Sequence, residues 1–323
     1  MINNYNLYVK EALSHYNIDP ESEVTFLRHN ENMTFRIGTG YLLQIHEPVE
    51  GFHTQFIFEG ADRMAVYETE LRFQAYLKKQ GMIIREPVEN CSGQWITRLN
   101  NGVTAAVSKW IEGESLDKLE LNDDHYYQIG ALTADLHRCA KGFYGFPAIA
   151  YDERQCERIR EKIRERQEGS GLNPACFIAM QRACDAAGSS LRKYHNDFLM
   201  LHADLSASNI LVTKSGLAAI DFSLFGLGHP MFDIATLFGN INGLHRRQKI
   251  AEGYRDAGGI FDYEALDACF VLTILGGITI HFEQWSKQDW FEGRMDRWCR
   301  ESFEPYSAGE RLFADDFYMI HAG

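Results

Sequence analysis

Asp204, Asn209 and Asp221 are residues whose types and spacing could do chemistry together. They flank a predicted β-hairpin, because the apolar runs 210–212 and 217–220 are separated by residues that favour a turn. We expect the two strands to pair so that Asn209 lies directly opposite Asp221. Directly paired residues have Cβ atoms about 4.5–5.5 Å apart, so an amide oxygen and a carboxylate should converge at the open end of the hairpin.

An amide oxygen and a carboxylate at that separation suit Mg²⁺, which in proteins takes one or two side-chain oxygens together with phosphate oxygens and water. Asp204 lies on the loop that enters the same hairpin, where it could contact a third group. In phosphoryl transfer that group is the acceptor hydroxyl, which a carboxylate orients and deprotonates. The spacing alone is also compatible with a structural role, because Asp and Asn are common turn formers at strand ends.

The motif His202-Ala203-Asp204 is followed by Asn209, by Asp221-Phe222 and by a segment that runs from Gly226 to Asp233. Together these motifs resemble the catalytic and metal-binding loops of the aminoglycoside phosphotransferase family, whose relatives include choline kinases, homoserine kinases and, more distantly, protein kinases. Weaker matches lie upstream, in residues 31–37, 41–46 and 129–137. The resemblance implies an α+β, bilobal protein-kinase-like fold, with a small β-rich N-terminal lobe and a larger, mainly helical C-terminal lobe.

The resemblance also implies a role for each matching residue. Asp204 would be the catalytic base that aligns the acceptor hydroxyl, and Asn209 and Asp221 would hold Mg²⁺ against the phosphates of ATP. His202 would pack behind the catalytic loop. Asp233 would either brace that loop by hydrogen bonds or cap its own helix. Little covalent work then falls on the protein, because positioning and charge neutralisation carry this chemistry.

The nucleotide would lie against the first lobe. The backbone of strand 103–110 and of Ile111 would form the hinge that meets the adenine, and loop 29–32 would bring its N–H groups near the phosphates. Glu70 matches the helix glutamate of the family, but Gln44 stands where kinases carry a basic residue for the α- and β-phosphates. The candidate nucleotide contacts are Asn32, Gln44, Glu70, Lys109 and Ile111.

Gln44 leaves three explanations open. Another cation, such as Arg36, could serve the phosphates instead. Gln44 could do so weakly, since a charge-assisted hydrogen bond is about twice as strong as a neutral one. The third explanation is a degenerate kinase that binds nucleotide without turnover.

We expect an ATP- and Mg²⁺-dependent phosphotransferase that acts on the hydroxyl of a small molecule, such as an amino alcohol, an amino acid, a sugar or an aminoglycoside. A bacterial stress-type Ser/Thr protein kinase of the same fold and a non-catalytic nucleotide-binding protein are the alternatives. Loop 29–32 lacks the glycines of eukaryotic-type protein kinases. Acids and aromatic residues alternate through 281–298, which could bind a cationic acceptor or could be a core face beside a solvated one.

The elements around these residues must position them. We expect strands and a single helix in the first third, with a hairpin turn at 38–40 and the helix over 61–79 ending at Gly81. From residue 111 onward the pattern is mainly helical, with Asn122 and Asn173 as N-caps. The chain therefore divides into a nucleotide-binding lobe, residues 1–110, and a catalytic and substrate-binding lobe, residues 111–323.

The composition limits the partners. The 323 residues carry 45 acidic and 32 basic side chains, a formal charge of −13, which argues against sequence-independent binding to nucleic acid or to an anionic membrane. The apolar stretch 270–282 is shorter than the about 20 residues that span a bilayer. The seven cysteines show no CxxC spacing, so we expect reduced thiols in a cytoplasmic protein, without a zinc site or a disulfide framework. The oligomeric state stays open.

Overall fold

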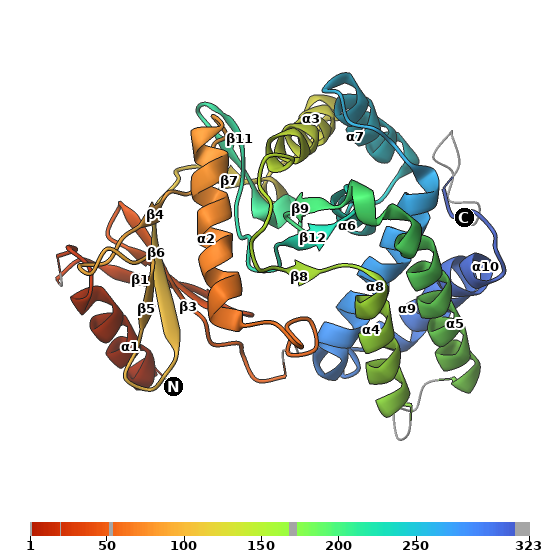
Figure 1. Ribbon diagram of the computed structural model, residues 1–323, viewed down its shortest axis with the longest axis horizontal. Coiled ribbons are helices and arrows are strands. Elements are labelled where there is room, and N and C mark those ends of the chain that lie inside the picture. The colour runs from red at the N-terminus through yellow and green to blue at the C-terminus, as the bar shows by residue number, and fades with distance from the viewer. Residues whose placement is uncertain (1, 20, 52–53, 168–172, 314–323) are drawn as a thin grey trace.

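The structure is a computed structural model that describes residues 2–19, 21–51, 54–167 and 173–313. A small lobe built on an antiparallel sheet lies on one side and a larger, mainly helical lobe on the other (Figure 1). This is the bilobal α+β arrangement expected from the sequence. The division between residues 110 and 111 stays a prediction.

The small lobe has a six-stranded sheet in the order β1-β2-β3-β6-β4, with β5 also paired to β6. The strands are β1 (Val24–His29), β2 (Met33–Ile37), β3 (Tyr41–Ile45), β4 (Pro87–Val88), β5 (Ile96–Arg98) and β6 (Thr104–Lys109). Side chains alternate between the two faces of a strand, so Phe35 and Leu43 join a buried apolar cluster while Thr34 and Gln44 lie on the opposite face. The hairpin expected at 38–40 is confirmed, because β2 pairs with β3 around it.

Helix α1 (Ile2–Ser14) covers one face of this sheet. Val9, Ala12 and Leu13 share a buried cluster with Phe35 and Leu43. The expectation of a single helix in the first third is therefore wrong. The helical spacing of these three α1 residues is the signal that could have predicted it.

Helix α2 (Arg63–Lys79) stands between the two lobes (Figure 1). Asp62 caps its first turn by accepting a hydrogen bond from the Met64 N–H at 3.0 Å, and Gly81 follows its last turn with φ 91°, as expected. The Phe73 ring packs against Phe222 of the large lobe with centroids 5.9 Å apart. The helix therefore joins the small lobe to the core of the large one.

The segment between β3 and α2 also crosses to the large lobe (Figure 1). Phe56, Ile57 and Phe58 are buried in the main apolar cluster of the large lobe. Arg158 of the large lobe donates a hydrogen bond to the Glu59 carbonyl at 2.9 Å. Part of the small lobe's chain is thus packed into its neighbour.

The large lobe combines helices with two small sheets, ordered β11-β10-β7 and β8-β12-β9. The helices are α3 (Asp123–Ala140), α4 (Glu153–Glu165), α5 (Pro174–Leu191), α6 (Met231–Asn240), α7 (Leu244–Asp256), α8 (Tyr263–Trp285), α9 (Phe291–Trp298) and α10 (Glu304–Ser307). The strands are β7 (Glu114–Ser115), β8 (Ile149–Ala150), β9 (Leu199–Leu201), β10 (Ile210–Thr213), β11 (Gly216–Ala219) and β12 (Gly226–Gly228). Asn122 and Asn173 cap α3 and α5, as expected.

Helix α8 is the longest helix of the described chain. Among the described residues it alone is long and apolar enough to cross a membrane, and 67% of its most apolar window is buried inside the protein. Such burial is typical of a core helix, which is what the apolar stretch 270–282 predicted.

Cys176 of α5 and Cys299, just after α9, form a disulfide with Cα atoms 5.7 Å apart. The expectation that the cysteines stay unpaired is therefore wrong for these two. They are 123 residues apart in the chain, so only tertiary packing brings them together. The remaining cysteines of the described chain are free: Cys91, Cys139, Cys156, Cys184 and Cys269.

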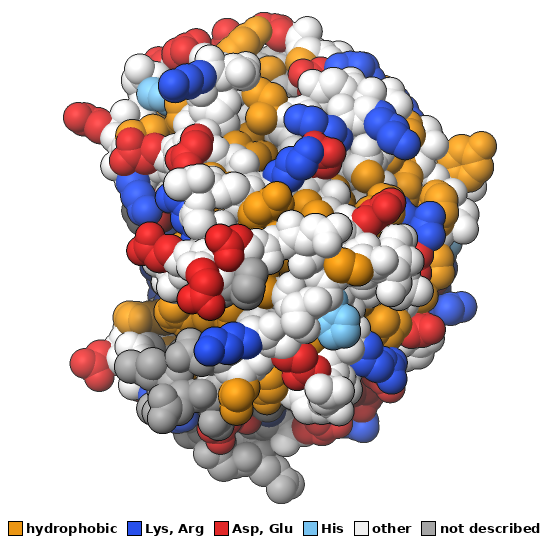
Figure 2. Space-filling view, turned by 90° about the vertical axis from the view of Figure 1, so that its left-hand side faces the viewer, with side chains coloured by type: hydrophobic (Ala, Val, Ile, Leu, Met, Phe, Trp, Pro, Cys, Tyr) orange, Lys and Arg blue, Asp and Glu red, His pale blue; other side chains and the backbone are white. Residues whose placement is uncertain are grey.

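The small-lobe side of the surface carries mixed charge. Figure 2 shows Lys and Arg side chains interspersed with Asp and Glu, without a continuous basic patch on the described part of this face.

Candidate active site

The catalytic-loop candidates are held from behind by Asp233 of α6. Its fully buried carboxylate accepts hydrogen bonds from the backbone N–H groups of His202 (3.2 Å) and Ala203 (2.6 Å). His137 Nε2 lies 3.0 Å from the same carboxylate. Ala203 has φ 62°, a left-handed conformation that is uncommon for a residue with a Cβ atom. Asp233 was expected either to brace this loop or to cap its own helix, and these hydrogen bonds brace the loop.

His202 packs behind the loop, as expected. It is completely buried, and its Nε2 lies 2.9 Å from the Ile220 carbonyl at the end of the hairpin. Burial lowers the pKa of His202, which favours the neutral ring. The side chain therefore ties the loop to the hairpin.

The hairpin register differs by one residue from the expected one. Thr213 pairs with Gly216, which leaves a turn of only two residues. Asn209 therefore faces Ile220, whose N–H donates to the Asn209 carbonyl at 2.9 Å. The prediction that Asn209 lies directly opposite Asp221 is wrong, because a turn one residue tighter moves every partner by one place.

Asp221 lies just beyond the hairpin and has φ 66°, so the chain changes direction there. The Ser223 hydroxyl lies 2.7 Å from Asp221 Oδ1, and Arg28 of β1 forms an ion pair with Asp221 Oδ2. The same hydroxyl lies 2.8 Å from Glu31 Oε1, in the loop between β1 and β2. Asp221 is thus the point where the large lobe meets the first hairpin of the small lobe.

Asn209 holds Asp204. Asn209 Nδ2 donates to Asp204 Oδ2 at 2.8 Å and to the Asp204 carbonyl at 2.9 Å. With the amide nitrogen engaged, Asn209 Oδ1 is buried with no hydrogen-bond partner in the described chain. A buried acceptor without a donor is costly, and a divalent cation is a group that would satisfy it.

No group of three or more His, Cys, Asp or Glu side chains that could hold a metal lies within the described ranges. A cation bound by Asn209 and Asp221 would therefore need further ligands, and Mg²⁺ ordinarily takes these from phosphates and water. The amide and carboxylate oxygens fit Mg²⁺ in donor type. Their assignment to a metal stays a prediction.

Acidic side chains crowd this centre. Burial raises the pKa of Asp204 to about 7 with a further contribution from Glu31, while the hydrogen bond from Asn209 and the charge of Arg28 act in the opposite direction. Burial and Glu31 likewise raise the pKa of Glu70 to about 8. A cation bound nearby would favour the ionised carboxylates.

Gln44 lies in a row of paired residues that crosses the sheet. It pairs with Thr34 of β2 on one side and with Ala106 of β6 on the other, and Thr34 pairs with Arg28 of β1. Because directly paired residues share a face, Arg28 and Gln44 lie on the same side of the sheet. Arg28 extends from this face to Asp221.

Two other nucleotide candidates are buried in the small lobe. Glu70 of α2 accepts a hydrogen bond from Gln74 Nε2 at 3.0 Å, rather than from a cation on β3. Asn32 is buried between β1 and β2, where its carbonyl accepts a hydrogen bond from the Asn30 N–H at 3.2 Å. Their contact with a nucleotide stays a prediction.

The hinge candidates lie at the end of β6. The Lys109 ammonium group donates to Glu86 at 3.0 Å, and the Lys109 N–H donates to the Glu86 carbonyl at 2.8 Å. The N–H of Trp110 donates to the Gly40 carbonyl at 2.8 Å. These backbone donors are used within the protein, so an adenine would have to meet Ile111 or the carbonyls of this segment.

Arg36, the alternative cation, faces the hinge. Its guanidinium lies 4.5 Å from the centroid of the Trp110 ring and pairs with Glu112 at 2.7 Å. Arg85 lies 6.0 Å from the same centroid. Arg36 Nε, Arg85 Nε and Trp110 Nε1 are all buried without a hydrogen-bond partner in the described chain. Three donors around one ring therefore lack acceptors.

No side-chain role was predicted for Glu31 or Arg28. Glu31 lies inside a weakly matching motif, and Arg28 lies on a predicted strand. Neither position carries a spacing signal for chemistry. Their approach to Asp204 and Asp221 depends on how the two lobes pack.

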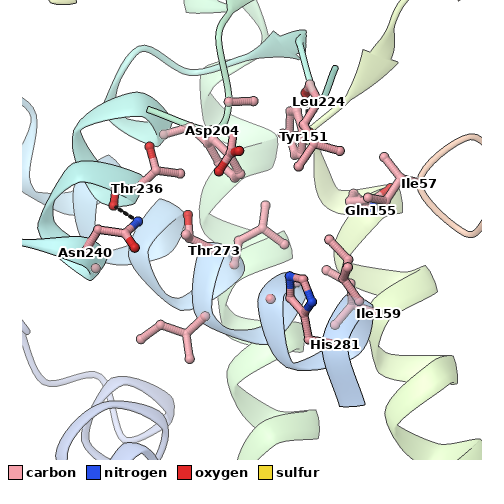
Figure 3. A pocket seen from close by; sticks show the side chains of 18 of the residues that line it. Ile57, Tyr151, Gln155, Ile159, Asp204, Leu224, Thr236, Asn240, Thr273 and His281 are labelled. Atoms are coloured by element: carbon pink, nitrogen blue, oxygen red, sulfur yellow. Dashed lines mark hydrogen bonds between the residues drawn. The ribbon is translucent and has the colours of Figure 1, made fainter. Parts of the chain in front are cut away.

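A cavity of about 420 Å³ opens in the large lobe with Asp204 in its wall. Figure 3 shows the Asp204 carboxylate near Thr236, Asn240 and Thr273, with Tyr151 and other residues on the opposite side. Thr273 Oγ1 is buried and has no hydrogen-bond partner in the described chain. The cavity thus joins a carboxylate to a polar wall with an unused donor and acceptor.

Four rings of segment 281–298 line the cavity, whereas its acidic residues do not. The lining rings are His281, Trp285, Trp290 and Trp298, and the rings of Phe282 and Phe291 lie outside the lining. The acids that alternate with them lie outside its lining: Glu283, Asp289, Glu292 and Asp296. Among the described lining residues, Asp204 is the single carboxylate and Arg294 the single Lys or Arg. Burial lowers the pKa of His281, so its ring favours the neutral form.

Comparison with protein families gives one clear match. The model of the phosphotransferase enzyme family matches residues 23–269 of the chain. Amicoumacin kinase of Bacillus subtilis (strain 168) is 22% identical over 245 residues, which cover 72% of this chain and 66% of that protein. The chain thus spans slightly less than two thirds of the length of this curated relative.

Several solved structures are similar over nearly the whole chain. The amicoumacin kinase hAmiN, in complex with AMP-PNP, Ca2+ and Ami, has a TM-score of 0.70 at 18% identity, covering 99% of this chain and 97% of that one. A microcompartment-associated aminopropanol kinase has a TM-score of 0.69 at 19% identity, covering 97% and 99%. A choline/ethanolamine kinase family protein from Mesorhizobium loti has a TM-score of 0.62 at 18% identity, covering 95% and 97%. At these identities the similarity shows the fold.

Proposed function

Because the chain belongs to the phosphotransferase enzyme family, we propose that it is an ATP- and Mg²⁺-dependent kinase that phosphorylates a hydroxyl group of a small molecule. The observation that carries this proposal is the position of Asp204. Its carboxylate lies in the wall of a cavity and is also bonded to Asn209, whose other amide atom is unpartnered. One carboxylate thus lies at the acceptor space and contacts the metal candidate Asn209.

Asp204 is the proposed base. It orients the acceptor hydroxyl, whose oxygen forms a bond to the γ-phosphorus of ATP. The bond from that phosphorus to the β,γ-bridging oxygen breaks, ADP leaves, and the hydroxyl proton passes to the Asp204 carboxylate. Asn209 keeps the carboxylate in place through Nδ2, and Asp233 fixes the backbone on which it stands.

Asn209 and Asp221 are the proposed holders of Mg²⁺. The unpartnered, buried Asn209 Oδ1 and the buried Asp221 carboxylate support this assignment. A bound Mg²⁺ would supply charge neutralisation for the phosphates. The pairing of Asp221 with Arg28 indicates that this carboxylate already attracts a positive charge.

The cavity is the proposed acceptor site. Three tryptophans and many aliphatic side chains in its lining favour a largely apolar molecule with ring systems. Thr236, Asn240 and Thr273 would meet the polar groups that surround the reacting hydroxyl. Gly239, Gly276 and Gly277 also line it, which leaves room for a bulky occupant.

A cationic acceptor stays a prediction, and the lining gives it limited support. The aromatic rings could hold an ammonium group, but Asp204 is the one carboxylate among the described lining residues and Arg294 brings a positive charge. The concave cavity of about 420 Å³ favours a small molecule over a protein acceptor. A cytoplasmic location, and an absence of nucleic-acid or membrane partners, also stay predictions.

The test is a screen for phosphoryl transfer. Purified protein is incubated with ATP and Mg²⁺ and a panel of hydroxyl compounds that ranges from apolar ring alcohols to amino alcohols, and ADP release is measured with mass spectrometry of the product. For an acceptor found in this way, Asp204→Asn should lower kcat by about 10²–10⁴-fold. Nucleotide affinity should stay nearly unchanged.

The matched control is Asp256→Asn, on the surface of α7, where the carboxylate accepts a hydrogen bond from Tyr127. This variant should keep full turnover. Full turnover in Asp204→Asn would exclude Asp204 as the base. A protein that binds Mg²⁺-ATP but phosphorylates nothing in a broad panel would favour the non-catalytic alternative.

A further inference from the structure

The small lobe brings an unexpected cation to the active site. Arg28 of β1 forms an ion pair with Asp221 of the large lobe. Its charge also counteracts the rise in the pKa of Asp204. The Arg28 guanidinium therefore lies near both large-lobe carboxylates of the proposed site.

Arg28 and Gln44 occupy one row on the same face of the sheet. Arg28 pairs with Thr34, and Thr34 pairs with Gln44. At the position of Gln44, kinases carry a basic residue that binds the α- and β-phosphates. In this protein the residue on β3 is uncharged, and the charged residue of the same row, Arg28, lies on β1.

Arg85 is a second arginine of the small lobe whose charge acts on the same region. Burial and the charge of Arg28 lower the pKa of Arg85 to about 10, and its Nε is buried without a partner in the described chain. A buried cation without an anion is costly. An anion near these two arginines would therefore be stabilised.

A metal bound to Asp221 would weaken its ion pair with Arg28. The Ser223 hydroxyl bonds one carboxylate oxygen and Arg28 pairs with the other. Each oxygen can accept a further partner, but a divalent cation on the same carboxylate repels the guanidinium, which then favours a second anion. The phosphates that accompany Mg²⁺ in Mg²⁺-ATP are anions of the right chemistry, since a guanidinium can bind them with two parallel hydrogen bonds.

We propose that Arg28 is the phosphate-binding cation of this protein and acts from β1 in place of the missing basic residue on β3. Before nucleotide binds, Arg28 neutralises Asp221; with Mg²⁺-nucleotide bound, Arg28 contacts the phosphates. In this arrangement Gln44 needs no charge, because Arg28 supplies the charge from the same row of paired residues. The inference rests on the proposed function, since it assigns a residue to the same nucleotide.

The experiment measures binding without turnover. Isothermal titration of the full chain with ATP, ADP and adenosine in the presence of Mg²⁺ is compared for the wild-type protein and Arg28→Gln. Affinity for ATP and ADP should fall by about tenfold or more, as expected for a lost hydrogen bond between charged groups. Affinity for adenosine should not change. The matched control is Arg98→Gln, an exposed arginine on β5 of the same lobe, which should bind all three ligands normally.

A second variant tests the row itself. Adding Gln44→Lys to Arg28→Gln returns a positive charge to the same face of the sheet. This double variant should recover most of the lost affinity for ATP. Arg28→Lys, which keeps the charge but loses the planar pair of donors, should bind ATP with intermediate affinity and serves if Arg28→Gln fails to fold.

Two results would overturn the inference alone. If Arg28→Gln binds Mg²⁺-ATP as tightly as wild type or more tightly, Arg28 only competes for Asp221. If adenosine binding falls as much as ATP binding, the residue shapes the lobe and does not bind phosphate. A wild-type protein that binds none of the three ligands would overturn the proposed function and this inference with it.

Discussion

The two sides of the active site differ in how their polar groups are satisfied. In the large lobe, Asp233 accepts hydrogen bonds from two backbone N–H groups of the loop that carries Asp204, and the Asp204 side chain is bonded to Asn209. In the small lobe, Arg36, Arg85 and Trp110 bury nitrogen atoms that have no partner in the described chain. The loop that carries Asp204 is held by bonds within the protein, whereas these three small-lobe nitrogens have no such bonds.

This difference teaches how the work is divided between fold and ligand. A catalytic group must be held in a fixed geometry before substrate binds, and the buried network around Asp233 does so. The two unpartnered atoms described in the large lobe, on Asn209 and Thr273, belong to the metal candidate and to the cavity wall. We infer that the protein alone fixes the backbone and carboxylate of the catalytic loop, whereas ligands would satisfy the small-lobe nitrogens, the Asn209 oxygen and the Thr273 hydroxyl.

The largest effect should follow from Asp233→Ala. Two buried N–H groups, on His202 and Ala203, would lose their acceptor, and Ala203 would lose the bonds that hold its left-handed conformation. An unsatisfied buried group costs about 1–3 kcal/mol, so we expect unfolding in urea to lose about 3 kcal/mol or more, together with nearly all turnover. Asp185→Ala, which removes a surface ion pair with Arg160, should cost less than about 1 kcal/mol. Equal losses in the two variants would contradict a preorganised loop.

A second effect, on stability without loss of the catalytic loop, should appear in the pH dependence of unfolding. The pKa of Glu70 is about 8 in the folded protein against 4.5 as its ordinary value, because it is buried near Glu31. A raised carboxyl pKa means that folding retains a proton, so this contribution is complete below about pH 4.5 and is lost as pH rises toward 8. Each pKa unit between the two states corresponds to about 1.4 kcal/mol. The melting temperature of Glu70→Gln should therefore vary less than that of the wild type between pH 4.5 and 8. Relative to the wild type, the variant should gain stability as the pH rises.

An unchanged slope in Glu70→Gln would mean that Glu70 stays ionised in the folded protein. Such a result would imply a cation close to it. The protein itself would then satisfy this carboxylate, and the small lobe would depend less on a bound ligand than we infer.

The smallest effect on the ligand-free protein should come from Trp110→Phe. The indole N–H has no hydrogen-bond partner in the described chain, so its removal leaves no acceptor unsatisfied. We expect a change in the free energy of unfolding within about 1 kcal/mol, mainly from lost contacts with Arg36. Adenosine binding, measured by titration, should weaken clearly. A large loss of stability with normal adenosine binding would show that the donor matters to the fold.

Local signals predicted much of the fold. The glycine turn at 38–40, the caps of α3 and α5 and the end of α2 at Gly81 depend on a few neighbouring residues, and each is present. The hairpin around 213–216 was expected, but its register was wrong, because pairing one place earlier or later keeps the same apolar runs together. The disulfide between Cys176 and Cys299 was missed, because a separation of 123 residues has no local signature.

The candidate site divides in the same way. Asp204 and Asn209 are close in sequence and form a hydrogen bond in the structure, so a short motif could point to them. Arg28 comes near the site only through the packing of the small lobe, which composition and spacing do not encode. Sequence reasoning identified a missing charge at Gln44, but it could not locate a cation on another strand.

The segment between β3 and α2 links the two lobes at the proposed acceptor site. Phe56 and Ile57 belong to the chain of the small lobe, yet they line the same cavity as Asp204. The width of the cavity therefore depends on how the lobes are oriented, and so does the fit of a nucleotide between them. If a bound nucleotide changes the affinity for the acceptor by some factor, a bound acceptor must change the affinity for the nucleotide by the same factor.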